Sequence, residues 1–355
     1  MTDHPAPLTA LLDGTLLPPE APLLRPDDLG VLRGEGVFET TLVVDGVARD
    51  LDDHLARLAI SAEMTGLVVP APDRWRTGVD ALVEAWTGDS QMVLRLVVSR
   101  GPESAVEPVC YLLGGQLSPV TRRQRTEGVR VLLLDRGFTA RTAADAPWLL
   151  AGAKTLSYGL NMAALRYAAG NDADDVIFLG SDGAVLEAPT ASVVVANGRT
   201  LSTPPRDGIL DGITVRRLFR SSRDTGWSTT TQVLTGADLH AAAGLWLVSS
   251  ARLLAPVTSI EGAPRDNHGL TAEIAALLDV PVDVGADETA AAEQAAGTGA
   301  GDGALAGAGL GAPAADLGRG WWHGGAEADP GTRRHFVDRA PVLSTGRQHM
   351  SEPGP

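Results

Sequence analysis

The sequence Ala151-Gly152-Ala153-Lys154-Thr155-Leu156-Ser157-Tyr158 contains the only lysine among 355 residues. Every other residue counted as Lys or Arg is an arginine. A lysine amine can lose its proton and attack a carbonyl to form a Schiff base, whereas a guanidinium stays protonated and is a poor nucleophile. The chain has therefore kept one residue whose chemistry arginine cannot replace, and Lys154 is the first candidate for a catalytic group.

The residues around Lys154 favour a partly desolvated amine. The preceding segment 147–153 carries no charged side chain. Apolar residues recur at helical spacing after the lysine, namely Leu156, Leu160, Ala163, Ala164 and Tyr167. This spacing predicts an amphipathic helix with Lys154 at its N-terminal end. Desolvation and a helix N-terminus both disfavour the ammonium form. The context therefore favours a reactive lysine over a lysine that is present by chance and has no catalytic role.

Length and composition limit the class of protein. A chain of 355 residues suggests two domains with enough apolar content for a core. The net charge of -15 argues against nucleic acid as the main partner. Cys110 is the single cysteine, and we recognise neither a signal-peptide pattern nor an apolar run long enough to span a membrane. We therefore expect a cytoplasmic protein without membrane contact, and the scattered histidines predict no metal site.

The chain divides by composition into four parts. Residues 1–112 mix strand-like and helical runs and predict a small N-terminal domain, and the polar, basic segment 113–128 predicts an interdomain connection. Residues 129–285 are rich in short apolar runs and predict a larger second domain. Residues 286–355 consist largely of Ala, Gly, Asp and Glu. Such a composition buries too little apolar surface to offset chain entropy, so we expect a disordered tail.

The periodicity of the apolar residues predicts a mixed α and β fold. Short apolar runs bounded by turn residues predict strands over 40–44, 92–99, 131–134, 175–179, 192–195 and 245–248. Helical spacing is found over residues 52–66 and 215–221. Helices between some of the strands place the chain in a mixed class.

Three further segments carry groups suited to chemistry. The run 182–187 predicts a turn and a strand ending at Glu187, a carboxylate that either salt-bridges a protonated ring nitrogen or pairs with an arginine. The turn 208–214 feeds a helix, and its backbone N–H groups and the Thr214 hydroxyl suit a phosphate. Ser249-Ser250-Ala251-Arg252 follows an apolar strand and offers either further hydroxyls or a helix cap.

Taken in order, these segments resemble the motifs of one enzyme family, the class IV (fold type IV) pyridoxal-phosphate enzymes. The matching segments are Lys154-Thr155-Leu156, Glu187, Thr203-Pro204-Pro205, Gly212-Ile213-Thr214 and Ser249-Ser250-Ala251. Arg33-Gly34-Glu35-Gly36-Val37-Phe38-Glu39-Thr40 resembles the family's GxGVFET segment, and His54-Leu55-Ala56-Arg57-Leu58 its HxxRL helix. The family includes branched-chain aminotransferases, D-amino-acid aminotransferases and 4-amino-4-deoxychorismate lyases. The resemblance covers about residues 10–265.

The resemblance implies a fold, a cofactor and a set of binding residues. The fold has a smaller N-terminal α/β domain and a larger, β-rich C-terminal pseudo-barrel that binds pyridoxal 5'-phosphate. Lys154 is implied to carry the cofactor as a Schiff base and to move the proton, and Glu187 to keep the pyridine nitrogen protonated. The phosphate is implied to bind Arg57, Ile213, Thr214 and Ser250, with Ile213 and Thr214 acting through backbone N–H groups. A small-molecule substrate and a homodimer are implied as well.

The resemblance also implies substrate contacts. Arg100 matches a position that contacts substrate carboxylate in some members, and a solvated arginine at a strand end is the alternative. Phe38, Ser250 and Ala251 are implied to lie beside the substrate. Thr40 resembles a threonine of the lyases that has been considered as a proton donor.

Three activities remain open at this point. Lys154-Thr155-Leu156, together with the strand and Arg-Gly turn over 94–101, favours aminodeoxychorismate lyase, which forms 4-aminobenzoate and pyruvate in folate biosynthesis. D-amino-acid aminotransferases share the Lys-Ser/Thr-Leu pattern, so a class IV aminotransferase acting on D-amino or branched-chain amino acids is the alternative, and one chain could have both activities. The third possibility is an enzyme that has lost its catalytic activity and serves as a binding or scaffold subunit. Such a protein would have no need to retain its single lysine. The sequence therefore predicts a lyase ahead of a transaminase.

Overall fold

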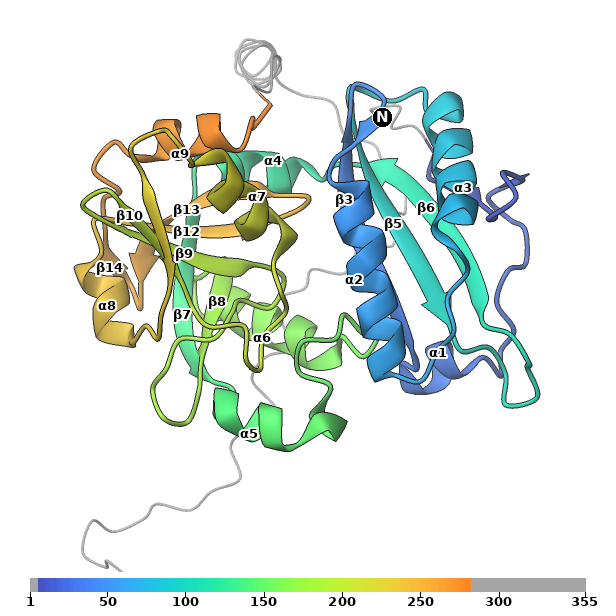
Figure 1. Cartoon of the computed structure of the whole chain (residues 1–355), viewed down its shortest axis with the longest axis horizontal. Helices are drawn as coiled ribbons and strands as arrows, with labels where there is room; N and C mark the ends of the chain where they lie inside the picture. The colour runs from blue at the N-terminus through green and yellow to red at the C-terminus, as the bar shows by residue number, and fades with distance from the viewer. Residues whose placement is uncertain (1–5, 282–355) are drawn as a thin grey trace, which may run out of the picture. The chain divides into compact units, whose positions relative to one another are not determined.

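The computed structural model describes residues 6–281, which contain two β-sheets with helices packed against them (Figure 1). The tail predicted over residues 286–355 lies outside the described residues. In the part that the structure describes, no helix is both long and apolar enough to cross a membrane. The mixed α and β fold predicted from the periodicity is confirmed.

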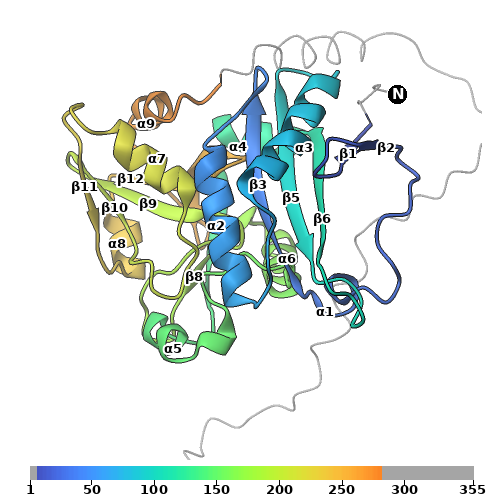
Figure 2. The same ribbon diagram turned by 45° about the vertical axis from the view of Figure 1, so that its right-hand side comes forward.

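The first sheet is antiparallel and has the strand order β2-β1-β6-β5-β3-β4. Its strands are β1 (Leu8–Ala10), β2 (Leu16–Leu17), β3 (Gly36–Val44), β4 (Val47–Ala48), β5 (Gln91–Ser99) and β6 (Val109–Gln116). The helices of this part of the chain are α1 (Leu29–Arg33), α2 (Leu51–Met64) and α3 (Pro72–Ala85). Figure 2 shows α2 and α3 beside β3, β5 and β6.

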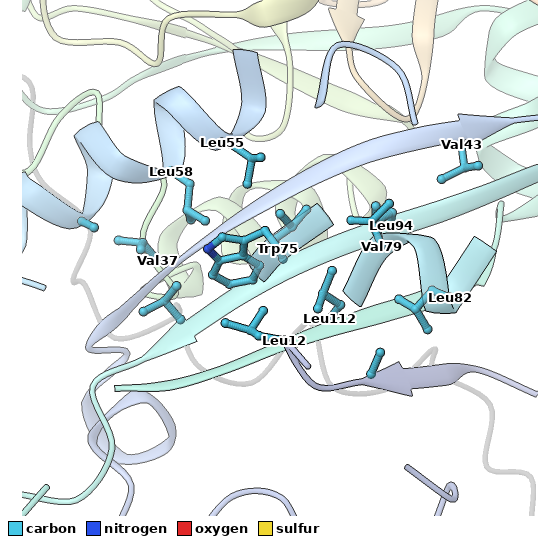
Figure 3. Close-up of a cluster of buried hydrophobic side chains, with 14 of the residues drawn as sticks. Leu12, Val37, Val43, Leu55, Leu58, Trp75, Val79, Leu82, Leu94 and Leu112 are labelled. Carbon is cyan, nitrogen blue, oxygen red and sulfur yellow. The ribbon is translucent and has the colours of Figure 1, made fainter. Parts of the chain in front are cut away.

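Alternate side chains separate the two faces of the first sheet. Val37 and Val43 of β3 and Leu94 of β5 point toward the helices, where they pack with Leu58 of α2 and Trp75 of α3 in one apolar cluster (Figure 3). Successive side chains of a strand point to opposite faces, so the intervening residues of these strands face away from α2 and α3. Because α2 and α3 do not cover this second face, it can form one wall of a site.

The second sheet has the strand order β11-β10-β9-β12-β13-β7-β8, with β14 paired to β13. Its strands are β7 (Val129–Asp135), β8 (Asp175–Leu179), β9 (Ser192–Asn197), β10 (Thr200–Thr203), β11 (Ser228–Thr231), β12 (Gly244–Ser249), β13 (Leu253–Ile260) and β14 (Ala263–Pro264). The accompanying helices are α4 (Pro119–Thr126), α5 (Ala140–Asp145), the 3-10 helix η1 (Pro147–Leu149), α6 (Gly159–Ala169), α7 (Ile213–Ser221), α8 (Gly236–Ala241) and α9 (Thr271–Leu277).

The central strands β9 and β12 are buried on both faces. Val193 and Leu247 belong to one apolar cluster, whereas Val194 and Trp246 belong to another on the opposite face of the sheet. A strand covered on both faces carries consecutive apolar residues rather than alternating ones. This explains why the runs 192–195 and 245–248 were recognisable as strands, and both predictions are confirmed.

The segment predicted as a connection, 113–128, contains the last residues of β6 and the whole of α4. The buried side chain of Arg125 in α4 donates to Gln91 Oε1 at 2.8 Å, and to the carbonyl oxygens of Ala251 at 2.9 Å and Arg252 at 3.1 Å. The segment is therefore bonded both to the edge of β5 and to the turn that follows β12.

The helix after the lysine begins later than the spacing predicted. Helix α6 starts at Gly159, and the apolar stripe expected along it is largely wrong, since Leu160 is 52% and Tyr167 56% exposed. The helix packs through Ala164, which the predicted stripe included, and through Ala168, which it did not. The physical reason is that the chain before α6 is bonded to β3, through a bridge between Thr155 and Val37 and a bond from Leu156 N to the carbonyl oxygen of Gly36, which delays the start of the helix.

The segment that holds Lys154 is joined to the first strand of the site wall. Phe38 N donates to the carbonyl oxygen of Lys154 at 3.0 Å, and Leu156 N donates to the carbonyl oxygen of Gly36 at 2.8 Å. A Cβ at Gly36 would lie 2.5 Å from both Leu156 Cδ1 and the carbonyl oxygen of Val98. Glycine at this position therefore permits the close approach that brings the lysine beside the first sheet.

Candidate active site

A cavity of about 900 Å³ is lined by both halves of the chain. The free face of β3, β5 and β6 forms one wall, and residues 149–158, 187–192, 208–214 and 248–252 form the other. All site residues predicted from the sequence line this cavity except Arg100; they are Phe38, Thr40, Arg57, Lys154, Glu187, Ile213, Thr214, Ser250 and Ala251. We call the face of β3, β5 and β6 the sheet wall and the remainder the loop wall.

Lys154 extends from the loop wall toward the sheet wall. Its backbone is fixed on both sides, because Lys154 N donates to Ser61 Oγ at 3.0 Å and its carbonyl accepts from Phe38 N. The Nζ atom lies 4.6 Å from the centre of the Phe38 ring and 3.4 Å from the Tyr158 hydroxyl. Burial lowers the pKa of the amine from 10.5 to about 8, so the amine loses its proton at a much lower pH than an exposed lysine does.

Glu187 lies on the loop wall after an extended segment. Residues 184–187 form hydrogen bonds with β8 and an isolated bridge to it, although the structure has no regular strand there. Glu187 Oε2 accepts from Leu210 N at 3.1 Å, and Oε1 has no hydrogen-bond partner among residues 6–281. Burial raises the pKa of this carboxyl, while Leu210 N–H and the charge of Arg136 oppose the shift. A cationic N–H in the cavity would therefore stabilise the carboxylate form.

The first turn of α7 offers an anion site. Gly212 precedes the helix and provides no side-chain cap, so the backbone N–H groups of Ile213 and Thr214 have no partner within the helix. These N–H groups, the Thr214 hydroxyl and Ser250 all belong to residues that line the cavity. A helix N-terminus with free N–H groups and a nearby hydroxyl favours a phosphate.

Arg57 reaches the same corner of the cavity from α2. Its Nη1 donates to the carbonyl oxygen of Asp211 at 2.7 Å, immediately before Gly212. Its Nε and Nη2 donate to the two carboxylate oxygens of Glu39 at 2.6 and 2.8 Å. The guanidinium therefore places a positive charge beside the N-terminus of α7.

The sheet wall contains a cation that the sequence reasoning missed. Thr40 of β3 pairs in register with Arg95 of β5, and both line the cavity. Arg95 has no ion-pair partner in the described part of the chain. It is the exposed residue in the middle of an otherwise buried strand, and the alternation of β5 was the signal that could have found it.

Arg100 lies outside the lining of the cavity. Its guanidinium pairs with Glu35 and donates to the carbonyl oxygen of Thr65 at 2.6 Å. The strand ends at Ser99, so the alternation that turns Arg95 toward the cavity does not extend to Arg100. The predicted contact between Arg100 and a substrate carboxylate therefore has no support in this arrangement.

Two further cavity residues were not singled out from the sequence. Arg136 stacks on Phe178, with its Cζ 4.4 Å from the ring centre, and its buried Nη1 has no hydrogen-bond partner among the described residues. Tyr158 packs edge-to-face with Phe38, and burial raises the pKa of its hydroxyl to about 12. Tyr158 lies in the stretch that contains Lys154 but had no predicted role, and Arg136 belongs to no local motif, so the assembled cavity reveals what both residues contact.

The groups around this cavity match the parts of pyridoxal phosphate. The Lys154 amine suits its aldehyde, the free Glu187 oxygen suits its ring nitrogen, and the N-terminus of α7 with Arg57 suits its phosphate. The fold and the site therefore define a pyridoxal-phosphate-dependent enzyme.

Comparison with known proteins identifies the family. Residues 36–260 match the family model described as Amino-transferase class IV. The bifunctional aminodeoxychorismate lyase / D-amino acid transaminase of Mycobacterium tuberculosis is 41% identical over 288 residues, which cover 78% of this chain and 99% of that relative. The chain belongs to the class IV aminotransferase family and is an enzyme that uses pyridoxal phosphate.

Solved structures agree with this assignment. A hypothetical aminotransferase from Mycobacterium tuberculosis, in its PLP-bound form, has a TM-score of 0.75 and 41% identity, and the match covers 77% of this chain and 98% of that chain. A fold IV transaminase from Curtobacterium pusillum has a TM-score of 0.73 and 37% identity, covering 78% and 100% of the two chains. The predicted type IV fold is confirmed.

Proposed function

We propose that this protein is an aminodeoxychorismate lyase, which converts 4-amino-4-deoxychorismate to 4-aminobenzoate and pyruvate. The observation that carries the proposal is the pair Thr40 and Arg95, a hydroxyl and an unpaired guanidinium in register on the sheet wall. The substrate carries two carboxylates, one of them on the enolpyruvyl group that leaves. A guanidinium can hold that carboxylate while the hydroxyl beside it supplies a proton.

The reaction needs one proton removed and one proton added. The Lys154 amine takes the proton from the ring carbon that bears the amino group, and its lowered pKa of about 8 suits a base near neutral pH. The C–O bond to the enolpyruvyl group breaks as the ring becomes aromatic. Thr40 Oγ donates a proton to the methylene carbon, so that pyruvate leaves, and the proton taken by Lys154 restores the balance.

The other residues of the loop wall hold and polarise the cofactor. Arg57, Ile213, Thr214 and Ser250 would bind its phosphate, and the carboxylate of Glu187 would accept the N–H of its ring. The bound cofactor supplies an electron sink for the carbon from which the proton leaves. Phe38 and Ala251 contribute apolar surface that excludes water from the reacting atoms.

The second candidate is a class IV aminotransferase acting on D-amino or branched-chain amino acids. The name of the Mycobacterium tuberculosis relative, which joins a lyase to a D-amino acid transaminase, favours the D-amino acid branch. In that reaction the same lysine would hold and move the proton that leaves the substrate carbon, and Arg95 would hold the carboxylate of the amino acid. One chain can carry both activities, because they share the loop wall.

The test supplies purified holoenzyme with 4-amino-4-deoxychorismate in the absence of any keto acid. We expect 4-aminobenzoate and pyruvate in equal amounts. If neither product forms, and the enzyme instead turns over a D- or branched-chain amino acid when a keto acid is present, the aminotransferase is the function. If both tests are positive, the ratio of the two kcat/KM values ranks the activities.

We also propose that the protein is a cytoplasmic homodimer that acts on small molecules. Large apolar side chains are exposed in η1 and α6, among them Trp148 at 76%, Leu160 at 52% and Tyr167 at 56%. Apolar surface of this kind favours contact with a second copy of the chain. Sedimentation equilibrium should give twice the monomer mass, and a monomer at micromolar concentration would contradict the dimer.

A further inference from the structure

We propose that Glu39 is the positioning residue for cofactor binding, because it fixes the guanidinium of Arg57 at the phosphate corner without touching the ligand. The inference rests on the proposed role of Arg57 at the phosphate, and it holds for a lyase and for an aminotransferase alike. Glu39 belongs to no motif of the loop wall.

The alternation of β3 turns Glu39 away from the cavity. Phe38 and Thr40, its neighbours in the strand, line the cavity, whereas Glu39 is fully buried on the face that packs against α2. A ligand in the cavity therefore cannot reach its carboxylate. Any effect of Glu39 on the cofactor has to act through a residue that touches both.

The carboxylate of Glu39 is saturated by buried partners. Both of its oxygens accept from Arg57, as described above, and Oε2 also lies 2.7 Å from His54 Nδ1 and accepts from Thr40 N at 3.2 Å. Although burial raises the pKa of the carboxyl, the charge and hydrogen bonds of Arg57 bring it down to about 2. Glu39 is therefore ionised wherever the enzyme works, and the two-pronged pair fixes the plane of the guanidinium.

Arg57 connects this carboxylate to the start of α7. Its Nη1 bonds to the carbonyl oxygen of Asp211, and its remaining N–H donors have no acceptor among residues 6–281. Arg57 lines the cavity beside Gly212, Ile213 and Thr214. The guanidinium is thus held by Glu39 and lies at the corner of the cavity where α7 begins.

The energetic consequence is preorganisation. An arginine that is already held in its binding geometry loses little side-chain entropy when a phosphate arrives. Without the carboxylate, Arg57 would be a buried charge without a counterion and would turn toward other acceptors. At metal sites, loss of an outer partner that orients a binding residue costs about 10–100-fold in affinity, and we expect a similar factor for Arg57.

The experiment compares two ligands that differ only in the phosphate. Apoprotein of the wild type and of Glu39→Gln is titrated with pyridoxal phosphate and with pyridoxal, and binding is followed by absorbance. We expect the Kd for pyridoxal phosphate to rise about 10–100-fold, and the Kd for pyridoxal to change less than about twofold. Glu35→Gln is the matched control, since Glu35 lies outside the cavity lining and pairs with Arg100; it should leave both constants unchanged.

A double variant separates positioning from a general loss of structure. Once Arg57→Gln has removed the guanidinium, adding Glu39→Gln should weaken pyridoxal phosphate binding no further. Independent losses in the double variant, or an equal loss for both ligands in Glu39→Gln alone, would overturn the proposal. If Glu39→Gln does not fold, Glu39→Asp keeps the charge but shortens the reach to Arg57, and the same two titrations apply. Because the readout is cofactor affinity, failure of the proposed lyase activity leaves this result unaffected.

Discussion

The two walls of the cavity are built in different ways. The loop wall consists of turns and a helix terminus, and each of its groups, Lys154, Glu187 and the N–H groups of α7, comes from a short local segment. The sheet wall consists of alternate side chains from three antiparallel strands, with Thr40 and Arg95 adjacent only because of the register. On the proposed function, the cofactor is held mainly by local segments, with Arg57 added from α2, whereas the substrate is selected by strand pairing.

The largest expected effect comes from replacing Lys154, the reactive group of the loop wall. Lys154→Arg keeps a positive charge and a long side chain but removes the amine that can lose its proton. We expect kcat to fall by roughly 10⁴-fold or more for both the lyase and the aminotransferase reaction, with an unchanged circular dichroism spectrum. Substantial turnover in this variant would refute the role of the lysine.

The next largest effect comes from replacing Thr40 of the sheet wall, which leaves the loop wall unchanged. Thr40→Val keeps the shape of the side chain and removes the hydroxyl. We expect pyruvate release to fall by about 100-fold, as for the loss of a general acid. Transamination of a D-amino acid and the absorbance of the bound cofactor should be little changed. Equal losses in the two reactions would mean that Thr40 is not the proton donor of the lyase.

A smaller effect tests whether Arg95 or Arg100 binds the substrate carboxylate. Arg95→Met removes an exposed, unpaired guanidinium from the cavity and should lower kcat/KM by about 10–100-fold, mainly through KM, as for the loss of a hydrogen bond to a charged group. Arg100→Met breaks a pair with Glu35 outside the cavity and is expected to change kcat/KM by less than about threefold. The reverse order of effects would restore the sequence prediction that Arg100 binds the carboxylate.

The smallest effect concerns the pH dependence of stability. Burial lowers the pKa of Lys154 from 10.5 to about 8, so between these values the unfolded chain binds a proton that the folded apoprotein does not. The stability of the apoprotein should therefore rise with pH across this window. The gain is about 1 kcal/mol, because the amine borders an open cavity, or about 2–4 °C in Tm. Burial raises the pKa of the Cys110 thiol from 9.0 to about 11, which opposes this rise above pH 9. Thermal unfolding between about pH 7.5 and 9 is therefore compared in the wild type and in Lys154→Met, and equal slopes in the two proteins would assign the effect to another group.

The fold and the loop wall were largely predictable from the sequence for a physical reason. A buried strand such as β9 or β12 is a continuous apolar run, and a phosphate turn requires particular small residues next to each other, so both leave a local pattern. Lys154 stood out because no other lysine is present.

Other features depend on contacts between distant segments. Arg95 acquires its place from its register with Thr40, and Glu39 from its pairing with Arg57 on another element. The exposed Leu160 and Tyr167 looked like a core stripe, because spacing predicts an apolar face but not what covers it. The alternation of β5 could have marked Arg95 as a residue that faces away from the core, but its neighbour Thr40, the partner of Glu39 and the exposure of α6 follow from tertiary structure.

The central claim, that this cavity binds pyridoxal phosphate covalently through Lys154, has a direct chemical test. Holoenzyme is reduced with sodium borohydride and digested, and the peptides are analysed by mass spectrometry. The account predicts a phosphopyridoxyl group on the peptide that contains Lys154 and the loss of the visible absorbance of the cofactor. A reduced protein whose Lys154 peptide is unmodified, although the cofactor had been bound, would contradict it.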